Sequence, residues 1–539
     1  MVGQIIGAHP NALLLDEDEG LMDWVWALVA KHSNRDRLFR DLIKRAVTKY
    51  HPGYPKIVRN FLRNTRLAPN VSHLVLKAPN LTYHHHEFAS LGYDISVVNP
   101  VRDVRAVVAS MEALGTVDIV QNQLRLLKKV HQDTGRYASE IAFLENPTTP
   151  IYLKRALIWE IKSTAHQQYS KAGLDPLVFR YEDCVADPLA HAHQLADHVG
   201  LNFTSEMVDH STVLHGRGPG LLRRNRPIDK RSVEKWRDHL TTMQERQILD
   251  QTTSAMKSLG YPSCASREAE SYVNAPVKPL RDDPIIVTGR GGSGTRLISK
   301  SVQDCGVFLG NRLNESEDSM EWVEAIYEIA AKVHTAEYEP SDSEEIDWQS
   351  RLALTANRIL QNGGIKQDQL WGFKLPESML IMPQLLSTFP NARVIHLVRH
   401  PITSSLRRTH LTSQTANPVG KAVCEAAYRD AGMEPSNALI DPDWKRNALT
   451  WNYQVGSVAN QLGEMPADRS LQVKFEDLCD DPQEVTNEIK AFLDGGSRIS
   501  ASIGIQTKRR KPRLGFFAPK EKIWEYCGAT ATKIGYTFT

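Results

Sequence analysis

Short runs of apolar residues alternate along the chain with longer stretches in which apolar residues recur at helical spacing. The apolar runs at 73–77, 94–99 and 177–180 are bounded by polar or proline-containing turns, which is typical of buried strands. Helical spacing is found at 104–114 and over 117–172. This alternation predicts an α/β fold with a parallel sheet, in which a ligand lies at the carboxyl ends of the strands.

Further stretches of the first half also have helical spacing. One of them opens the chain and stops before His9 and Pro10, and another follows Asp187, a residue type that caps helices. These stretches are 2–8, 24–50, 81–91, 188–199 and 233–259.

A polar segment separates two regions with this alternating pattern. Residues 263–283 include Pro276 and Pro279, which is typical of a linker. We therefore expect two domains, at 1–262 and 284–539. A length of 539 residues agrees with this, because it exceeds that of an ordinary single domain.

The second region begins with a strand, a Gly-rich turn and a helix start. The apolar run Ile285–Val287 predicts the strand, the turn runs from Gly289 to Gly294, and the helix is expected to begin at Thr295. Glycines allow backbone N–H groups to approach an anion, and a helix N-terminus favours negative charge. The segment therefore predicts a phosphate cradle. It is not a Walker A loop, because Thr295 and Arg296 follow the last glycine where that loop has Lys.

The second half of the chain repeats landmarks of the first half at a nearly constant distance. Lys77 precedes Arg102 by 25 positions and Lys374 precedes Arg399 by the same interval, so one offset of 297 relates both pairs (374 − 77 and 399 − 102). A Glu-Asp dipeptide and a Gly-Tyr dipeptide recur later in both halves, in the same order. These ordered matches predict two tandem copies of one domain.

The first copy lacks a Gly-rich loop of its own. At the same offset, the equivalent of the loop falls just before Met1. We expect the protein to begin upstream, because the sequence from Met1 to Pro10 reads as the continuation of an interrupted loop and helix. In the chain as given, only the second copy has a complete cradle.

Composition narrows the class of protein. The chain is 41% hydrophobic and 24% charged with a net charge of +2, so it has no overall attraction to nucleic acid or membranes. Six cysteines are scattered without a C-x-x-C pair, which disfavours a zinc site or a disulfide framework and fits a reducing compartment. We find neither a membrane-spanning run nor a good signal peptide. We therefore expect a cytoplasmic enzyme.

Three motifs together resemble the sulfotransferase family: the Gly-rich loop, a Lys-x-Pro strand end, and a strand that ends in Arg with Ser eight residues on. In this chain the Lys is Lys77 or Lys374, and the Arg and Ser are Arg102 and Ser110. The resemblance covers nearly all of both halves. It implies a P-loop-like three-layer α/β fold with a central parallel sheet in two tandem copies. It also implies 3′-phosphoadenosine-5′-phosphosulfate as the co-substrate, with no metal expected.

In that family the Gly-rich loop holds the 5′-phosphosulfate, and the Arg and Ser hold the 3′-phosphate. The second copy has Arg399, but Arg407 stands at its Ser position, with Ser404 nearby. By its charge, Arg407 or Arg408 is a substitute for that Ser. The expected donor-binding residues are Arg290, Gly291, Gly292, Ser293, Gly294, Thr295, Arg296, Arg399, Ser404, Arg407, Arg102 and Ser110.

The loop departs from the family at one position. Many members carry Lys or Arg just before Ser-Gly-Thr, where this chain has Gly292. Arg290 or Arg296 is then expected to supply the positive charge.

Sulfuryl transfer places charge on a departing phosphate, so it needs preorganised positive charge and a base for the acceptor hydroxyl. Related enzymes use Glu or His as the base. The candidates here are Glu315 in the second copy and Glu17 in the first, and Arg290 and Lys374 are expected to stabilise the transition state. We expect the second copy to be the catalytic one.

Two other functions stay open. One is a P-loop nucleotide-binding phosphotransferase, or a kinase-like protein, which magnesium dependence would distinguish. The other is that one copy is a degenerate, non-catalytic partner of the other. The acceptor, a hydroxyl or an amine, is not identified by the sequence, and neither is the oligomeric state. We expect no nucleic-acid partner.

Overall fold

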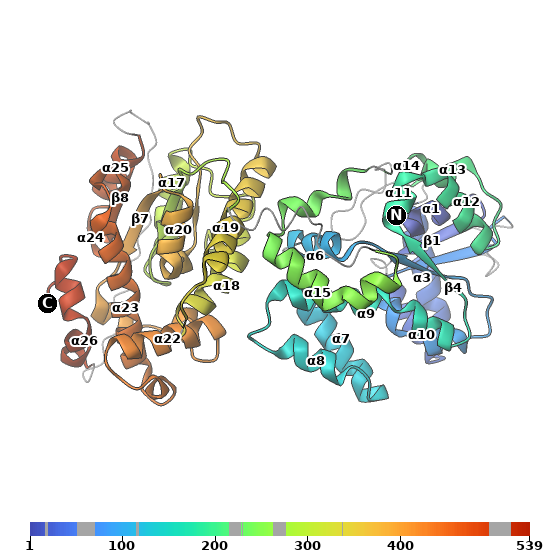
Figure 1. Cartoon of the computed structure of the whole chain (residues 1–539), viewed down its shortest axis with the longest axis horizontal. Helices are drawn as coiled ribbons and strands as arrows, with labels where there is room; N and C mark the ends of the chain where they lie inside the picture. The colour runs from blue at the N-terminus through green and yellow to red at the C-terminus, as the bar shows by residue number, and fades with distance from the viewer. Residues whose placement is uncertain are drawn as a thin grey trace. The chain divides into compact units, whose positions relative to one another are not determined.

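The chain forms two compact units in the computed structural model (Figure 1). Unit 1 consists of Met1–Arg237 with Gln244–Ala265, and unit 2 of Asp238–Met243 with Ser266–Thr539. The domain boundaries expected from the sequence stay a prediction. The structure describes residues 1–16, 20–50, 70–114, 118–214, 228, 230–261, 276–336, 338–494 and 519–538.

Unit 2 is built on a four-stranded parallel sheet of order β6-β5-β7-β8. Val287 of the first strand pairs with Lys374 on one side and Ile395 on the other, so the carboxyl ends of the strands lie at one edge. The strands are β5 (Ile285–Thr288), β6 (Gly372–Lys374), β7 (Arg393–Val398) and β8 (Ser470–Lys474).

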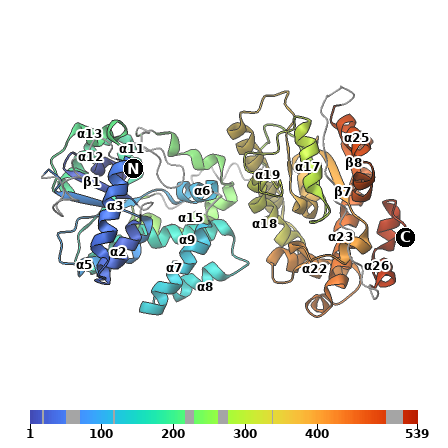
Figure 2. The same ribbon diagram turned by 180° about the vertical axis from the view of Figure 1, so that it is seen from behind.

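Helices cover both faces of this sheet. Successive strand residues point to opposite sides, and here the residues on both sides are apolar. Ile286 and Val394 belong to a core with α18 (Val323–Val333), α19 (Asp342–Gly363) and α23 (Asp443–Glu464). Ile285 and Ile395 belong to a second core with α17 (Thr295–Asp304) and α25 (Pro482–Asp494). Figure 2 shows α17 in front of the strands. The predicted α/β fold with a central parallel sheet is therefore confirmed.

The described helices of unit 2 include ten of α type. They are α17 (Thr295–Asp304), α18 (Val323–Val333), α19 (Asp342–Gly363), α20 (Met382–Thr388), α21 (Pro401–Ser405), α22 (Pro418–Asp430), α23 (Asp443–Glu464), α24 (Phe475–Asp480), α25 (Pro482–Asp494) and α26 (Lys520–Lys533). Its short 3-10 helices are η6 (Met320–Trp322), η7 (Pro376–Ile381), η8 (Leu411–Ser413), η9 (Pro435–Leu439) and η10 (Ala467–Arg469).

The described strands of unit 1 form two separate parallel pairs, β1 with β2 and β3 with β4. Leu13 and Leu15 of β1 pack on α2 and α3. The strands are β1 (Ala12–Asp16), β2 (His73–Lys77), β3 (Val97–Val101) and β4 (Pro176–Arg180). The helices are α1 (Val2–Gly7), α2 (Leu21–Val29), α3 (Arg35–Tyr50), η2 (Pro79–Tyr83), α5 (His85–Ala89), α6 (Val104–Ala113), α7 (Ile119–Thr134), α8 (Ala138–Glu145), α9 (Ile151–Ser163), α10 (His166–Lys171), α11 (Tyr181–Ala186), α12 (Pro188–His198), α13 (Ser205–Val208), α14 (His210–Val213), η4 (Lys230–Ser232), η5 (Lys235–Asp238) and α15 (Thr242–Ser258).

Several predicted helices are interrupted. The stretch 24–50 divides into α2 and α3, with Lys31 in a left-handed conformation (φ 53°) between them. The stretch 117–172 divides into four helices, the first of which ends at Gly135 (φ 71°). Periodicity alone does not register such breaks, because the apolar spacing resumes after each turn.

Candidate active site

The Gly-rich loop connects β5 to α17 at the carboxyl edge of the sheet. Gly289, Gly292 and Gly294 have φ of 153°, 84° and 107°, a region that favours glycine. A Cβ on Gly289 would lie 2.3 Å from the carbonyl oxygen of Leu397, and one on Gly294 would lie 2.6 Å from the ring of Phe475. The loop therefore needs glycine both for its conformation and for its close packing.

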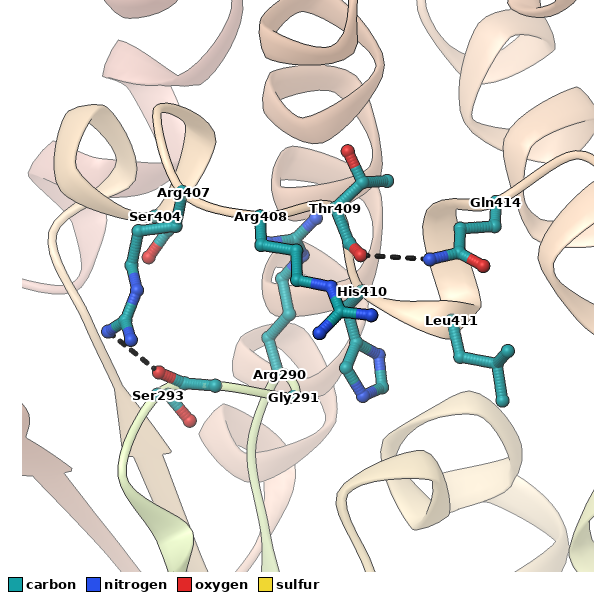
Figure 3. Close-up of a pocket in the computed structure, with 11 residues that line it drawn as sticks. Arg290, Gly291, Ser293, Ser404, Arg407, Arg408, Thr409, His410, Leu411 and Gln414 are labelled. Carbon is teal, nitrogen blue, oxygen red and sulfur yellow. Dashed lines mark hydrogen bonds between the residues drawn. The ribbon is translucent and has the colours of Figure 1, made fainter.

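A pocket of about 430 Å³ opens at this loop (Figure 3). The loop forms one wall, and the segment that begins at the end of α21 forms the wall across from it. The lining residues are Arg290, Gly291, Gly292, Ser293, Ser404, Arg407, Arg408, Thr409, His410, Leu411 and Gln414. Six of the expected donor-binding residues are thus brought together, namely Arg290, Gly291, Gly292, Ser293, Ser404 and Arg407.

Arg290 anchors the loop. Its side chain is buried, and its Nη2 donates to Ser413 Oγ at 2.9 Å, Asn447 Oδ1 at 3.1 Å and Thr450 Oγ1 at 3.3 Å. Burial lowers the pKa of Arg290 to about 10. These bonds tie the loop to η8 and α23, so the guanidinium has a structural role beside its predicted catalytic one.

Arg399 follows β7 and presents a buried cation. Its guanidinium carbon lies 4.1 Å from the centre of the Phe475 ring, and its Nε is buried without a hydrogen-bond partner among the described residues. Burial, together with the charge of Arg407, lowers the pKa of Arg399. The Ser404 hydroxyl donates to the Arg399 carbonyl at 3.5 Å.

Three hydrogen bonds hold the turn that carries Arg399. The Trp451 indole N–H donates to the Arg399 carbonyl at 3.1 Å. The Glu476 carboxylate accepts the backbone N–H of His400 at 3.1 Å and the hydroxyl of Tyr536 at 2.7 Å. The backbone that carries Arg399 is therefore held by the side chains of Trp451 and Glu476, and Tyr536 in turn holds Glu476.

Unit 1 has a matching set of hydrogen bonds around Arg102. The Trp159 indole N–H donates to the Arg102 carbonyl at 2.8 Å. The Glu182 carboxylate accepts the backbone N–H of Asp103 at 3.0 Å and the hydroxyl of Tyr261 at 2.7 Å. Each partner stands in the same chain order as its counterpart in unit 2.

The other expected residues of unit 1 are not gathered into a comparable site. The Arg102 guanidinium donates to the carbonyl of Ser232 and lies over the Tyr181 ring. Ser110 is exposed on α6, and Lys77 forms a 3.4 Å ion pair with Asp16. Glu17 lies outside the described residues.

Two further side chains meet the loop from the opposite wall. Arg407 Nη1 donates to the Gly292 carbonyl at 3.2 Å. The His410 ring lies against Gly291, where an added Cβ would be 2.0 Å from its Nε2. Burial, together with the charge of Arg290, lowers the pKa of His410 to about 4, so this imidazole is neutral near pH 7.

Lys374 is almost fully buried, and its ammonium is paired. Its side chain is 2% exposed. Its Nζ lies 2.5 Å from Asp318 Oδ1 and donates to the Ser316 carbonyl at 2.9 Å. Glu315 is exposed in the same turn and does not line the pocket. The catalytic roles of Lys374 and Glu315 stay predictions.

Three expected loop residues, Gly294, Thr295 and Arg296, do not line the pocket. Gly294 and Thr295 begin α17, with Thr295 buried. Arg296 is exposed and does not line the pocket. Among the two arginines expected to supply charge at the loop, one is thus bound in a buried network and the other lies outside the pocket.

Sequence reasoning did not single out His410 or the buried Glu377, whose carboxylate lies 3.8 Å from His410 Nε2. Glu377 accepts the Tyr327 hydroxyl at 3.0 Å, and burial raises its pKa. The only signal for Glu377 was its place one residue after the Lys-x-Pro strand end. In the part of the chain that the structure describes, no group of three His, Cys, Asp or Glu side chains has metal-binding geometry.

Comparisons with known proteins cover part of the chain. Residues 284–495 match the sulfotransferase family model. No curated protein matches the chain. No described helix is both long and apolar enough to cross a membrane.

Solved structures of sulfotransferases are similar to part of the chain. A sulfotransferase domain from the curacin biosynthetic pathway is 16% identical, with 40% of this chain and 75% of that chain covered and a TM-score of 0.24. A sulfotransferase from Alicyclobacillus acidocaldarius is 12% identical, with 47% and 94% covered and a TM-score of 0.28. Sulfotransferase STF9 from Mycobacterium avium is 15% identical, with 49% and 72% covered and a TM-score of 0.23. Likenesses of this size carry no further conclusion. The family match includes the Gly-rich loop and Arg399, and it confirms the predicted enzyme class, a sulfotransferase.

Proposed function

We propose that the chain transfers a sulfuryl group from 3′-phosphoadenosine-5′-phosphosulfate to a hydroxyl or an amine of an acceptor, and that unit 2 performs the reaction. The observation that carries this proposal is the pocket between the Gly-rich loop and the segment 404–414. It combines backbone N–H groups at a helix N-terminus with arginine side chains, which suits a phosphosulfate.

The residues of the site fit this donor. Ser293 Oγ and Arg399 Nε are buried and have no hydrogen-bond partner among the described residues. Buried polar atoms are ordinarily satisfied, so these two support the presence of a ligand. Gly289 and Gly294 have no room for a side chain. The loop therefore offers mainly its backbone N–H groups to the donor.

The donor supplies an activated sulfuryl group, and the residues of the chain position it. The loop N–H groups and Thr295 are suited to the 5′ phosphosulfate, and Arg399 with Ser404 is suited to the 3′-phosphate. In the reaction, the acceptor oxygen forms a bond to sulfur, and the bond from sulfur to the bridging oxygen breaks with its electron pair going to the phosphate. The acceptor proton passes to a general base, for which Glu315 stays the prediction.

The matching hydrogen bonds around Arg102 and Arg399 support two tandem copies. Glu182 and Glu476 each accept the backbone N–H of the residue after the arginine and the hydroxyl of a late tyrosine. In unit 1 the Arg102 guanidinium donates to a carbonyl of its own chain. This favours a first copy that is a non-catalytic partner of the second.

The acceptor and the setting are also proposals. We infer a hydroxyl-bearing acceptor, and no nucleic-acid partner because the net charge is only +2. Five cysteines in the described part of the chain are in no disulfide, namely Cys184, Cys305, Cys424, Cys479 and Cys527. Cysteines outside disulfides support a reducing, cytoplasmic setting.

Calorimetric titration of the full chain with adenosine 3′,5′-bisphosphate tests this function. Wild-type protein is expected to bind the nucleotide in the presence of a chelator. Arg399→Met is expected to weaken binding by about 10–100-fold, because hydrogen bonds to charged groups contribute about 1.5–3 kcal/mol. Lys421→Ala, on the exposed surface of α22, is the control. The phosphotransferase alternative predicts instead that ATP with magnesium binds and the bisphosphate does not.

A further inference from the structure

The Gly-rich loop brings little charge of its own to the pocket. Gly291 and Gly292 have no side chain, and Ser293 is buried. The Arg290 guanidinium is bound by three buried partners on η8 and α23. An anion in this loop therefore needs a cation from elsewhere in unit 2.

The opposite wall supplies cations. Arg407 and Arg408 both line the pocket, as does Thr409 between Arg408 and His410. Among the described lining residues three are arginines and none is acidic, and His410 adds no charge near pH 7. The pocket thus has the electrostatics of an anion site.

We propose that Arg408 is a catalytic residue, which binds the phosphosulfate held in the Gly-rich loop and stabilises the charge that develops on the departing phosphate. Arg407 and His410 are positioning residues that hold Arg408 over the loop. This inference rests on the proposed function. It differs from the sequence-based interpretation, in which Arg407 or Arg408 replaces a Ser at the 3′-phosphate.

Within the described part of the chain, Arg408 differs from Arg290 and Arg407 in making no side-chain contact to a protein group. Arg290 and Arg407 donate to protein groups. Arg408 is exposed and forms no hydrogen bond or ion pair within the described part of the chain. Figure 3 shows its side chain extending toward the part of the loop that carries Arg290 and Gly291. Its five N–H donors are thus available to a ligand.

The backbone on both sides of Arg408 is fixed to the loop. On one side, Arg407 Nη1 donates to the Gly292 carbonyl at 3.2 Å. On the other, the His410 ring rests on Gly291, and its Nδ1 accepts the backbone N–H of Thr412 at 3.4 Å. These contacts keep the backbone of Arg408 beside the loop, so its guanidinium can reach an anion held there without a rearrangement of the segment, and donors placed in advance are a main source of transition-state stabilisation.

In the chemical step, Arg408 stabilises the departing phosphate. As the bond from sulfur to the bridging oxygen breaks, its electron pair stays on the phosphate, and the guanidinium donates hydrogen bonds to that phosphate. The acceptor forms the new bond to sulfur and loses its proton to the general base. Arg408 exchanges no proton, so its effect is on the rate of bond cleavage more than on nucleotide binding.

Two measurements on the full chain test Arg408→Ala. The first is the rate of sulfate release from 3′-phosphoadenosine-5′-phosphosulfate into water, which requires no acceptor. The second is calorimetric binding of adenosine 3′,5′-bisphosphate. We expect release to fall by about 10²–10³-fold, the effect of removing one oxyanion donor, and binding to fall by less than about tenfold. Arg408→Lys should retain part of the rate, and Lys421→Ala should behave as wild type.

A second test moves the positive charge from position 408 to the Gly-rich loop. A Cβ on Gly292 would meet no atom within 4 Å, so Gly292→Lys can place an ammonium on the loop itself, at the cost of the strain of a positive φ. In the Arg408→Ala background this change should recover part of the release rate. An Arg408→Ala variant that binds bisphosphate and releases sulfate at the wild-type rate would overturn the inference. Wild-type protein that neither binds the nucleotide nor releases sulfate would overturn the proposed function, and the inference with it.

Discussion

The carboxylate of Glu476 accepts the backbone N–H of His400 at 3.1 Å and so fixes the residue next to Arg399. Its other oxygen accepts the Tyr536 hydroxyl at 2.7 Å, and burial with the nearby Glu476 charge raises the pKa of that hydroxyl. One carboxylate therefore joins the end of β7 to the C-terminal segment that follows α26.

Loss of the Glu476 carboxylate is expected to lower the free energy of unfolding more than loss of either of its hydrogen bonds alone. Tyr536→Phe should lower the free energy of unfolding by about 1.5–3 kcal/mol, the contribution of one hydrogen bond to a charged group. Glu476→Ala should lower it by about 2–4 kcal/mol, because the N–H of His400 then also loses its acceptor. Urea denaturation followed by tryptophan fluorescence measures both.

Variants of the equivalent residues in unit 1, Glu182 and Tyr261, distinguish an effect on stability from an effect on nucleotide binding. Glu182→Ala and Tyr261→Phe remove the equivalent bonds and should lower stability in the same order. If unit 2 holds the nucleotide, only Glu476→Ala should also weaken binding of adenosine 3′,5′-bisphosphate. Equal loss of binding in both units would contradict the choice of unit 2.

Local patterns allowed the elements of this site to be predicted from the sequence. The strand at Ile285, the helix start at Thr295 and the strand 73–77 were predicted correctly, because each depends on a few neighbouring residues. The contacts of Arg407 and His410 with the loop were not predictable in this way. Each joins residues more than 100 positions apart, so it depends on the order of the strands.

The acidic run 315–318, one residue of which pairs with Lys374, illustrates the same limit. Periodicity and charge do not tell which of its carboxylates points inward. Glu317 has a left-handed conformation (φ 62°), the next residue, Asp318, pairs with Lys374, and Glu315 is exposed. Asp318 is thus the carboxylate of the run that pairs with Lys374, with its side chain 18% exposed.

The buried His396 is expected to make stability depend on pH. It is fully buried on β7, neither ring nitrogen has a hydrogen-bond partner among the described residues, and burial lowers its pKa to about 4. Because the unfolded chain has the higher pKa, about 6.5, it binds the proton first as the pH falls. Stability should therefore be lost between about pH 6.5 and 4, by about 3 kcal/mol from this residue.

His396→Leu removes that contribution. Its free energy of unfolding should fall less than that of wild type between pH 7 and pH 4.5, whatever its value at pH 8. Parallel curves for the two proteins over this range would contradict the prediction. Chemical denaturation in a series of buffers provides the measurement.

The ion pair of Lys374 with Asp318 should be important for stability whether or not Lys374 is catalytic. Asp318→Asn leaves the Lys374 ammonium, 2% exposed, without its carboxylate. We expect a loss of about 3–5 kcal/mol, as for other buried pairs broken on one side. The double variant Lys374→Met with Asp318→Asn should regain much of it.

Catalysis then separates the two roles of Lys374. If it stabilises the transition state, the double variant should be folded and bind adenosine 3′,5′-bisphosphate, yet release sulfate far more slowly than wild type. Wild-type turnover in the double variant would show that the lysine is structural only.

The His410 ring occupies the space that a side chain at position 291 would need. A Cβ on Gly291 would lie 2.0 Å from His410 Nε2, so Gly291→Ala should displace the imidazole and with it the segment that carries Arg408. We expect sulfate release to fall by at least about tenfold, since small displacements of a preorganised donor are costly. His410→Ala in the same chain vacates the volume and should restore part of the rate.

Gly292→Ala shows whether this rescue is specific. Its Cβ would meet no atom within 4 Å, and its cost comes from a positive φ of 84°, a strain of about 1–2 kcal/mol. His410→Ala cannot relieve that strain, so it should not improve Gly292→Ala. Rescue of both alanine variants, or of neither, would mean that His410 does not hold Arg408 over the loop through its contact with Gly291. Rescue of Gly291→Ala alone would locate the positioning contact at this one pair of residues.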